Sequence, residues 1–320
     1  MVVAMMLIGA ITRLTESGLS MVEYRPLIGI FPPLSDAEWN RVFGLYRTTS
    51  EYRLENTGMS LDDFKGIFWW EYIHRLWGRL VGAAFSIPLL WFLFRGAVPS
   101  WLKPHLILLL LLGGMQGMIG WWMVKSGFID RHDVSQYRLT VHLSLAFVIL
   151  GYMIWLIADL LEKPGNDSPA PGWLRNLLAV MLVIVFVTLT SGGLVAGLSA
   201  GFDYNTWPSM AGSLLPNGIF DATPPWRAAF EDTLTVQFNH RILAYLTFTG
   251  IIIAFIASRN APGTFFQKRI LALFAAAAVI QVMLGIATLL SVVAISFAVL
   301  HQAGAILLFC CAVLAYRAHR

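Results

Sequence analysis

Seven long apolar runs constrain the fold of this chain more than any other feature of its sequence. Each run is long enough to cross the hydrocarbon core of a bilayer as a helix, which takes about 20 residues. A helix satisfies its own backbone hydrogen bonds in lipid, so these runs predict an all-α integral membrane protein. The runs are residues 68–94, 105–124, 139–161, 173–198, 234–257, 270–290 and 297–316.

The composition of the chain agrees with a membrane protein. Hydrophobic residues make up 58% of the sequence and charged residues 12%, whereas soluble domains are about 25% charged. The net charge of +4 does not indicate nucleic acid, because the basic residues are scattered over short loops. The two cysteines, Cys310 and Cys311, are adjacent in the last apolar run, and we interpret them as packing residues.

A further apolar run, residues 2–14, is short for a transmembrane helix. It lacks the charged start and the small-residue cleavage site of a signal peptide. We interpret it as the trailing part of a first helix whose beginning is missing or whose start codon was placed late. With this segment the sequence predicts eight transmembrane helices.

The charges of the loops predict the orientation in the membrane. The short loops are dense in Lys and Arg, whereas the long loops 13–67 and 199–233 hold more acidic than basic residues. Short loops rich in Lys and Arg face the cytoplasm. Both termini are therefore expected inside, and the two long loops are expected on the periplasmic side of a bacterial inner membrane.

The two halves of the chain resemble each other. The segment EYIHRLWGRL around His74 matches QFNHRILAYL around His240, and TVHLSLAFVIL around His142 matches AVLHQAGAILL around His301. Between these segments, MQGMIG in the first half echoes QVMLGIA in the second. The repeat therefore covers the surroundings of four histidines.

Four helices in each half give the two repeats the same direction through the membrane. We therefore predict two parallel-related four-helix bundles, formed by residues 1–162 and residues 163–320. Equivalent sites in the two bundles are then expected on the same outer face of the membrane.

The four repeated histidines are the leading candidates for a functional site, since each is expected within roughly the first two turns of an alternate helix. Two imidazoles on facing helices of a bundle can ligate a heme iron from opposite sides. A di-metal or zinc centre is disfavoured, because only Glu71 and His74 have the Glu-x-x-His spacing and Gln237 stands at the equivalent position. The remaining histidines are interpreted as ordinary polar residues: His105, His132 and His319.

Arginines adjoin the candidate heme ligands. Arg75 and Arg241 directly follow the first histidine of each half, and Arg79 lies one turn beyond Arg75. Guanidinium groups suit the two propionates of a heme. The alternatives are snorkelling to lipid headgroups and, for Arg75, an ion pair with Glu71.

Glu71 is the most informative difference between the halves, because the second half has Gln237 at this position. A pure electron carrier has no evident need for a carboxylate there. A site that oxidises a bound molecule could use it for proton transfer or for orienting water. The alternative is a counter-ion for Arg75.

The motifs around these residues are long and specific. They are RLTESGLSMVEYRPLIGIFPPLSDAEW, GMSLDDFKGIFWWEYIHRLWGRL, LLGGMQGMIGWWMVKSG, YRLTVHLSLA, NTWPSMAGSLLPNGIFD, PPWRAAFEDTLTVQFNHR and VLHQAGA. Together they resemble heme A synthases of the alphaproteobacterial and mitochondrial type. The resemblance runs from about Arg13 to the last helix.

The resemblance implies an enzyme that converts heme O to heme A for cytochrome c oxidase, by oxidising the C8 methyl group to a formyl group through successive hydroxylations. It implies a heme b cofactor on His240 and His301 and a substrate heme in the half that contains His74 and His142. It also implies a catalytic role for Glu71.

The chain departs from this family in two respects. The long loops 13–67 and 199–233 contain no cysteine, so a loop disulfide cannot carry electrons here. The N-terminal apolar run is also shorter than the usual first helix of the family.

The alternative function is a bis-heme b electron carrier between quinol and an acceptor. A transporter is disfavoured, because its site would lie at the membrane midplane whereas these histidines cluster at one face. Besides heme O and membrane lipid, the open partners are a heme O synthase, oxidase assembly factors and a second copy of the chain.

Overall fold

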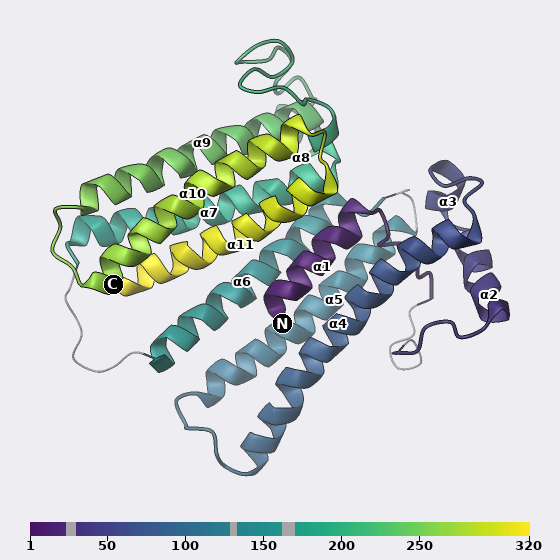
Figure 1. Ribbon diagram of the computed structural model, residues 1–320, viewed down its shortest axis with the longest axis horizontal. Coiled ribbons are helices and arrows are strands. Elements are labelled where there is room, and N and C mark those ends of the chain that lie inside the picture. Colours follow the sequence, from purple (N-terminus) through teal and green to yellow (C-terminus); the bar gives the residue numbers. More distant parts are fainter. Residues whose placement is uncertain (24–29, 129–132, 162–169) are drawn as a thin grey trace. The chain divides into compact units, whose positions relative to one another are not determined.

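Helices are the regular elements of the computed structural model, which describes residues 1–23, 30–128, 133–161 and 170–320 (Figure 1). The long helices are α4 (Leu61–Phe94), α5 (Lys103–Gly127), α6 (Gln136–Leu161), α7 (Gly172–Gly197), α9 (Thr233–Ser258), α10 (Phe265–Leu290) and α11 (Ile295–Ala318). The shorter elements are α1 (Val2–Leu14), α2 (Asp36–Tyr46), α3 (Ser50–Leu54), α8 (Ala228–Glu231) and the 3₁₀ turns η2 (Ala200–Phe202) and η3 (Pro225–Arg227).

Each of the seven long helices overlaps one of the seven predicted runs. Within the described ranges, these seven are long and apolar enough to cross a membrane, whereas α1, with 13 residues, is apolar but shorter. The prediction of an all-α membrane protein is therefore confirmed. The described residues contain seven helices of membrane-spanning length and the short apolar helix α1, in agreement with the seven long runs and the shortened first segment of the sequence. The arrangement in two four-helix bundles stays a prediction.

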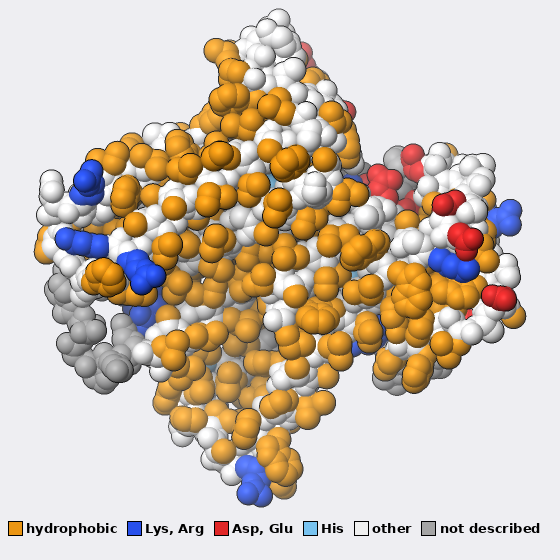
Figure 2. All heavy atoms as spheres, in the orientation of Figure 1, with side chains coloured by type: hydrophobic (Ala, Val, Ile, Leu, Met, Phe, Trp, Pro, Cys, Tyr) orange, Lys and Arg blue, Asp and Glu red, His pale blue; other side chains and the backbone are white. Residues whose placement is uncertain are grey.

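Large hydrophobic side chains lie on the outside of these helices. Figure 2 shows that hydrophobic side chains cover much of the visible helical surface, while Lys and Arg side chains gather near helix ends. On α4, for example, Leu90, Trp91 and Phe94 are all more than half exposed. Apolar surface of this extent is suited to contact with lipid and is unusual for a protein in water.

Helix α4 begins at Leu61, well before the apolar run that predicted it. A capping box starts the helix: the Asp63 N–H donates to the Ser60 hydroxyl, and the Ser60 N–H donates to the Asp63 carboxylate. With about 3.6 residues per turn, His74 lies more than three turns from the start of α4. The expectation that all four histidines lie in the first two turns is therefore wrong for His74.

Residues Met1–His142 form one compact unit, in which α1 packs along α4. Arg13, at the end of α1, forms an ion pair with Asp133 at 2.7 Å, just before α6. The segment between α1 and α4 is anchored by an aromatic cluster that joins α2 to the first turns of α4. The cluster consists of Trp39, Tyr46, Phe64, Phe68 and Tyr72.

Residues Leu143–Arg320 form a second compact unit, in which α10 packs against α11 and α7 packs against α9 (Figure 1). The remainder of α6 belongs to this unit. Its Phe147 ring contacts the Phe309 ring of α11 at a centroid distance of 5.3 Å, and its Asp159 pairs with Arg317 at 2.6 Å. The units thus divide within α6, and the assignment of the whole of α6 to an N-terminal bundle stays a prediction.

Candidate functional site

Each of the four repeated histidines packs against a glycine of a neighbouring helix. A methyl group added to any of these glycines would come within 2.9 to 3.3 Å of an imidazole atom, which is closer than ordinary van der Waals contact. The absence of a side chain therefore lets each ring lie against a helix backbone. The pairs are Gly9 with His74, Gly120 with His142, Gly192 with His240 and Gly285 with His301.

The structure brings these histidines together two by two. In the first unit, His74 on α4 and His142 on α6 are close enough for an electrostatic interaction between their rings. In the second unit, His240 on α9 and His301 on α11 interact in the same way. All four histidine residues are half-buried. Each unit therefore holds one pair of imidazoles, and each pair lies within its own unit.

Two glutamines, which the sequence comparison did not single out, hold the second histidine of each pair. Gln116 Nε2 donates to the backbone oxygen of His142 at 3.0 Å, and Gln281 Nε2 donates to that of His301 at 3.1 Å. Each glutamine lies one turn before the glycine that meets the same ring. The repeated spacing Gln-x-x-x-Gly was visible in the sequence as QGMIG and QVMLG, and it could have identified this device.

Glu71 is buried, at 2% exposure, and three donors converge on its carboxylate. Ser20 Oγ donates to Oε2 at 2.7 Å and the Met21 N–H donates to Oε2 at 2.6 Å. Arg75 Nη2 donates to Oε1 and to the Met21 carbonyl. The ion pair with Arg75 is therefore present, and Glu71 also ties the segment after α1 to α4.

Gln237 makes the corresponding link in the second unit with the opposite polarity. Its Nε2 donates to the Ala200 carbonyl at 2.8 Å, while its Oε1 accepts from Arg241 Nη2 at 3.1 Å. The loop of the first unit offers a hydroxyl and an N–H to Glu71, whereas the loop of the second unit offers a carbonyl to Gln237. The side chain at each position therefore matches the groups that its own loop presents.

The chain matches a sequence model of the cytochrome oxidase assembly protein family, COX15-CtaA, over residues 1–313. The chain belongs to this family. Among similar proteins, one from Rhodospirillum centenum is 50% identical over 309 residues, which is 96% of this chain and 82% of the relative. One from Nitrosospira multiformis is 46% identical over 312 residues, or 97% of this chain and 87% of the relative. Both relatives are named heme A synthase.

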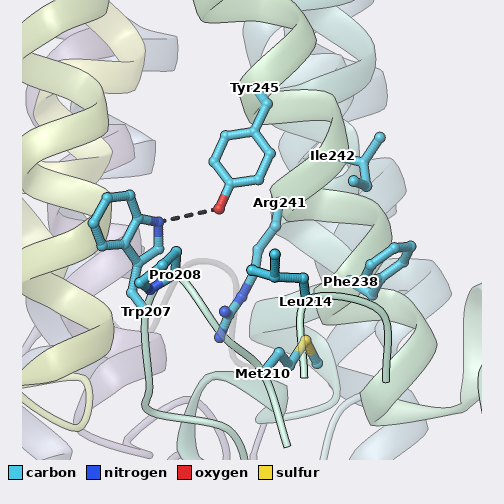
Figure 3. A pocket seen from close by; sticks show the side chains of 8 residues that line it. All are labelled: Trp207, Pro208, Met210, Leu214, Phe238, Arg241, Ile242 and Tyr245. Atoms are coloured by element: carbon cyan, nitrogen blue, oxygen red, sulfur yellow. Dashed lines mark hydrogen bonds between the residues drawn. The ribbon is translucent and has the colours of Figure 1, made fainter. Parts of the chain in front are cut away.

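In this member of the family, Arg241 holds the loop after α7. Its Nη1 donates to the carbonyls of Thr206 and Ser209, and its Nη2 donates to that of Tyr204. Figure 3 shows the Arg241 side chain directed toward the part of this loop that carries Met210. The buried Nε has no hydrogen-bond partner among the described residues.

The loop and α9 line an open pocket of about 370 Å³ beside Arg241 (Figure 3). Trp207 Nε1 donates to the Tyr245 hydroxyl at 3.1 Å across it. The other lining residues are Pro208, Met210, Leu214, Phe238 and Ile242.

Arg75 and Arg79 line a second pocket, of about 340 Å³, in the first unit. The wall opposite α4 comes from the segment before α2 and from α2 itself, where Arg41 pairs with Glu23 and Glu38 at 3.0 and 2.7 Å. The two arginines predicted near His74 are thus brought to one cavity, next to the Glu71 carboxylate that Arg75 holds.

The other histidines lie apart from the two pairs. His105 stacks edge-on against Trp101 near the start of α5, and the buried Nδ1 of His319 contacts the Ala315 carbonyl at 2.7 Å. Burial lowers the pKa of His319 below its ordinary value. His132 lies outside the described residues.

Glu51, on α3, is a buried carboxyl that the sequence analysis did not single out. It is 5% exposed, and its Oε2 has no hydrogen-bond partner in the described part of the chain. Burial raises its pKa to about 8, and nearby Glu71, Asp133 and Glu16 act in the same direction. Its acidic neighbours could not be inferred from the sequence, because they come from three separate segments of the chain.

Proposed function

We infer that this chain is a heme A synthase, a membrane oxidoreductase that converts heme O to heme A for cytochrome c oxidase. In this reaction the C8 methyl group of the porphyrin is oxidised to a formyl group through successive hydroxylations. The observation that carries this inference is the 45 to 50% identity, over nearly the whole chain, to relatives named heme A synthase.

His240 and His301 are the proposed ligands of a heme b cofactor in the second unit. The residues present fit such a group, because two imidazoles are paired there and the buried Nε of Arg241 lacks an acceptor among the described residues. A heme propionate would be a suitable acceptor for that N–H. When bound, heme b supplies one-electron redox chemistry to this site.

His74 and His142 are the proposed residues that hold the iron of the substrate, heme O, in the first unit. Arg75 and Arg79 would bind its propionates, since both line the same pocket on the His74 helix. Arg75 would do so while it holds Glu71, because only Nη2 of its three nitrogens makes the contacts to Glu71 and Met21.

Glu71 is the proposed catalytic carboxylate. Oxidation of a methyl group releases protons, and Glu71 lies one helical turn from His74, with Ser20 and Met21 fixing its position. We propose that Glu71 accepts a proton at the carboxylate or orients the water that reacts. The hydrogen bonds that anchor the loop would then also place the carboxylate.

The enzyme is proposed to lie in the bacterial inner membrane with both termini in the cytoplasm and both histidine pairs toward the periplasmic side. The excess of Lys and Arg in the short loops supports this orientation. A heme O synthase, oxidase assembly factors and a second copy of the chain remain candidate partners.

The direct test is co-expression with a heme O synthase in a host that lacks heme A, followed by chromatography of the extracted hemes. The expected result is heme A, with a hydroxylated intermediate in partial reactions. A His105→Ala variant serves as the matched control and should give the same products. Accumulation of heme O alone would contradict the enzyme assignment and leave the bis-heme electron carrier as the better reading.

A further inference from the structure

The imidazole of His240 is held by a hydroxyl that has a defined donor and acceptor role. Ser191 Oγ lies 2.8 Å from Nδ1 of His240 and 2.7 Å from the backbone oxygen of Thr188. A serine hydroxyl has a single proton, and a carbonyl oxygen can only accept. Ser191 therefore donates to Thr188, and it accepts from an N–H at Nδ1.

This arrangement fixes the tautomer of His240. With the proton on Nδ1, the lone pair is on Nε2, which is the atom left to bind a metal. The ring edge that meets Gly192 is the Cε1 and Nδ1 edge, so Nε2 is directed away from α7.

The helix that supplies the hydroxyl is itself fixed against α9. Thr188 Oγ1 and Thr247 Oγ1 are 2.7 Å apart, and Thr188 Oγ1 also donates to the Ile184 carbonyl at 2.8 Å. The hydroxyl of Ser191 is thus held by the turn of α7 that is joined to the His240 helix.

The first unit lacks this device at the equivalent position. The glycine that meets His74 is Gly9, and the residue before it is Ile8, where the second unit has Ser191 before Gly192. In the described part of the chain, neither ring nitrogen of His74 forms a hydrogen bond. The atom of His74 nearest to Gly9 is Nε2, so its ring is turned differently from that of His240.

We propose that Ser191 is a positioning residue that makes His240 a permanent heme ligand, and that Ile8 at the equivalent place leaves His74 able to exchange its heme. The proposal rests on the assignment of the cofactor to the second unit and of the substrate to the first. A resident cofactor has to stay bound, whereas a substrate has to enter and a product has to leave. A hydrogen bond from the second nitrogen of a ligating histidine orients the ring and raises its basicity, and its loss typically costs about 10- to 100-fold in metal affinity.

The test compares Ser191→Ala with the unmodified full-length protein, both purified in detergent with their hemes. The rate at which heme b passes to added apomyoglobin should rise about 10- to 100-fold in Ser191→Ala. The midpoint potential should also rise, because a less basic imidazole stabilises ferric iron less. Ser191→Thr keeps the hydroxyl and should restore both values. Ser86→Ala is the matched control, since among the described residues Ser86 Oγ bonds only to the Gly82 carbonyl of its own helix.

If Ser191→Ala protein is not recovered, Ser191→Cys takes its place, because a thiol is a much weaker acceptor of similar size. Unchanged heme transfer and potential in the Ser191 variants would overturn the proposal. Absence of heme b from the unmodified protein would instead overturn the cofactor assignment.

Discussion

Ser20 Oγ donates a 2.7 Å hydrogen bond to Oε2 of Glu71 and thereby joins the segment after α1 to α4, the helix that carries His74. The bond gives the carboxylate a structural function in addition to its proposed catalytic one. The two functions predict different results when each partner is changed separately.

Glu71→Gln should leave the heme b spectrum intact and lower conversion of heme O by about 100-fold or more, as expected for loss of a group that transfers protons. Ser20→Ala keeps the carboxylate and removes one hydrogen bond to a charged group, which should cost about 2 kcal/mol of stability and leave most of the activity. The measurement is the ratio of heme A to heme O in extracts at equal protein content. Similar losses in both variants would show that Glu71 acts only by anchoring the loop.

Replacement of His240 or His301 by Ala should remove the stable b-type absorbance, because each residue supplies one of the two proposed iron ligands in the second unit. His74→Ala should retain that absorbance and abolish conversion of heme O. Reduced-minus-oxidised spectra of purified protein provide the measurement, with His105→Ala as the control. A b-type spectrum that survives in both of the first two variants would contradict the cofactor assignment.

The glycines that face the histidines should resist substitution even by alanine. The new methyl group would lie 2.9 Å from Cε1 of His142 in Gly120→Ala and 3.0 Å from Cε1 of His301 in Gly285→Ala. Each ring would have to move, so Gly285→Ala should weaken heme b binding, while Gly120→Ala should lower conversion of heme O and spare heme b. Gly82→Ala is the control, because a methyl group there meets no atom of the described residues within 4 Å.

Two spectra and one chromatogram per variant distinguish these outcomes. If Gly285→Ala and Gly82→Ala retain heme b equally, then the close approach of Gly285 to His301 is not needed for heme b binding. An alanine in place of glycine in a helix otherwise tends to stabilise it by about 1 kcal/mol, so a loss of heme in Gly285→Ala would not come from weaker helix formation.

The long helices and the four histidines could be predicted because their signals are local or repeated. An apolar run of the length of α10 predicts a helix without knowledge of its neighbours. The motif around His74 could be compared with the motif around His240 within the same sequence. The early start of α4 was missed although Ser60 and Asp63 form a recognisable capping box. The apolar run begins only at Phe68, so hydropathy alone places the start of the helix there.

The contacts of Glu71 could not be predicted, because they depend on the path of a loop. Nothing in the sequence places Ser20 beside Glu71 or the Ala200 carbonyl beside Gln237. From the sequence, the difference between Glu71 and Gln237 could be interpreted only through their chemistry. The structure adds that the loop beside Glu71 donates hydrogen bonds, whereas the loop beside Gln237 accepts one.

Glu51 should make the stability of the protein depend on pH. Its pKa is raised from 4.5 to about 8 in the folded state, so between these values the folded protein binds more protons than the unfolded one. The free energy of unfolding should therefore fall as pH rises from about 5 to about 8 and then level off. The charged or titratable side chains that act on Glu51 are Glu71, Asp133, Glu16, Arg13 and Tyr46.

Glu51→Gln removes this titration and leaves the neighbouring groups in place. The melting temperature in detergent should fall less between pH 5 and pH 8.5 for Glu51→Gln than for the unmodified protein. At pH 8.5 the variant should therefore be the more stable of the two proteins. Glu55→Gln is the matched control, since Glu55 is exposed at the end of the same short helix. Because the other groups titrate equally in both proteins, an identical pH dependence of Glu51→Gln and the unmodified protein would show that Glu51 is not protonated at neutral pH.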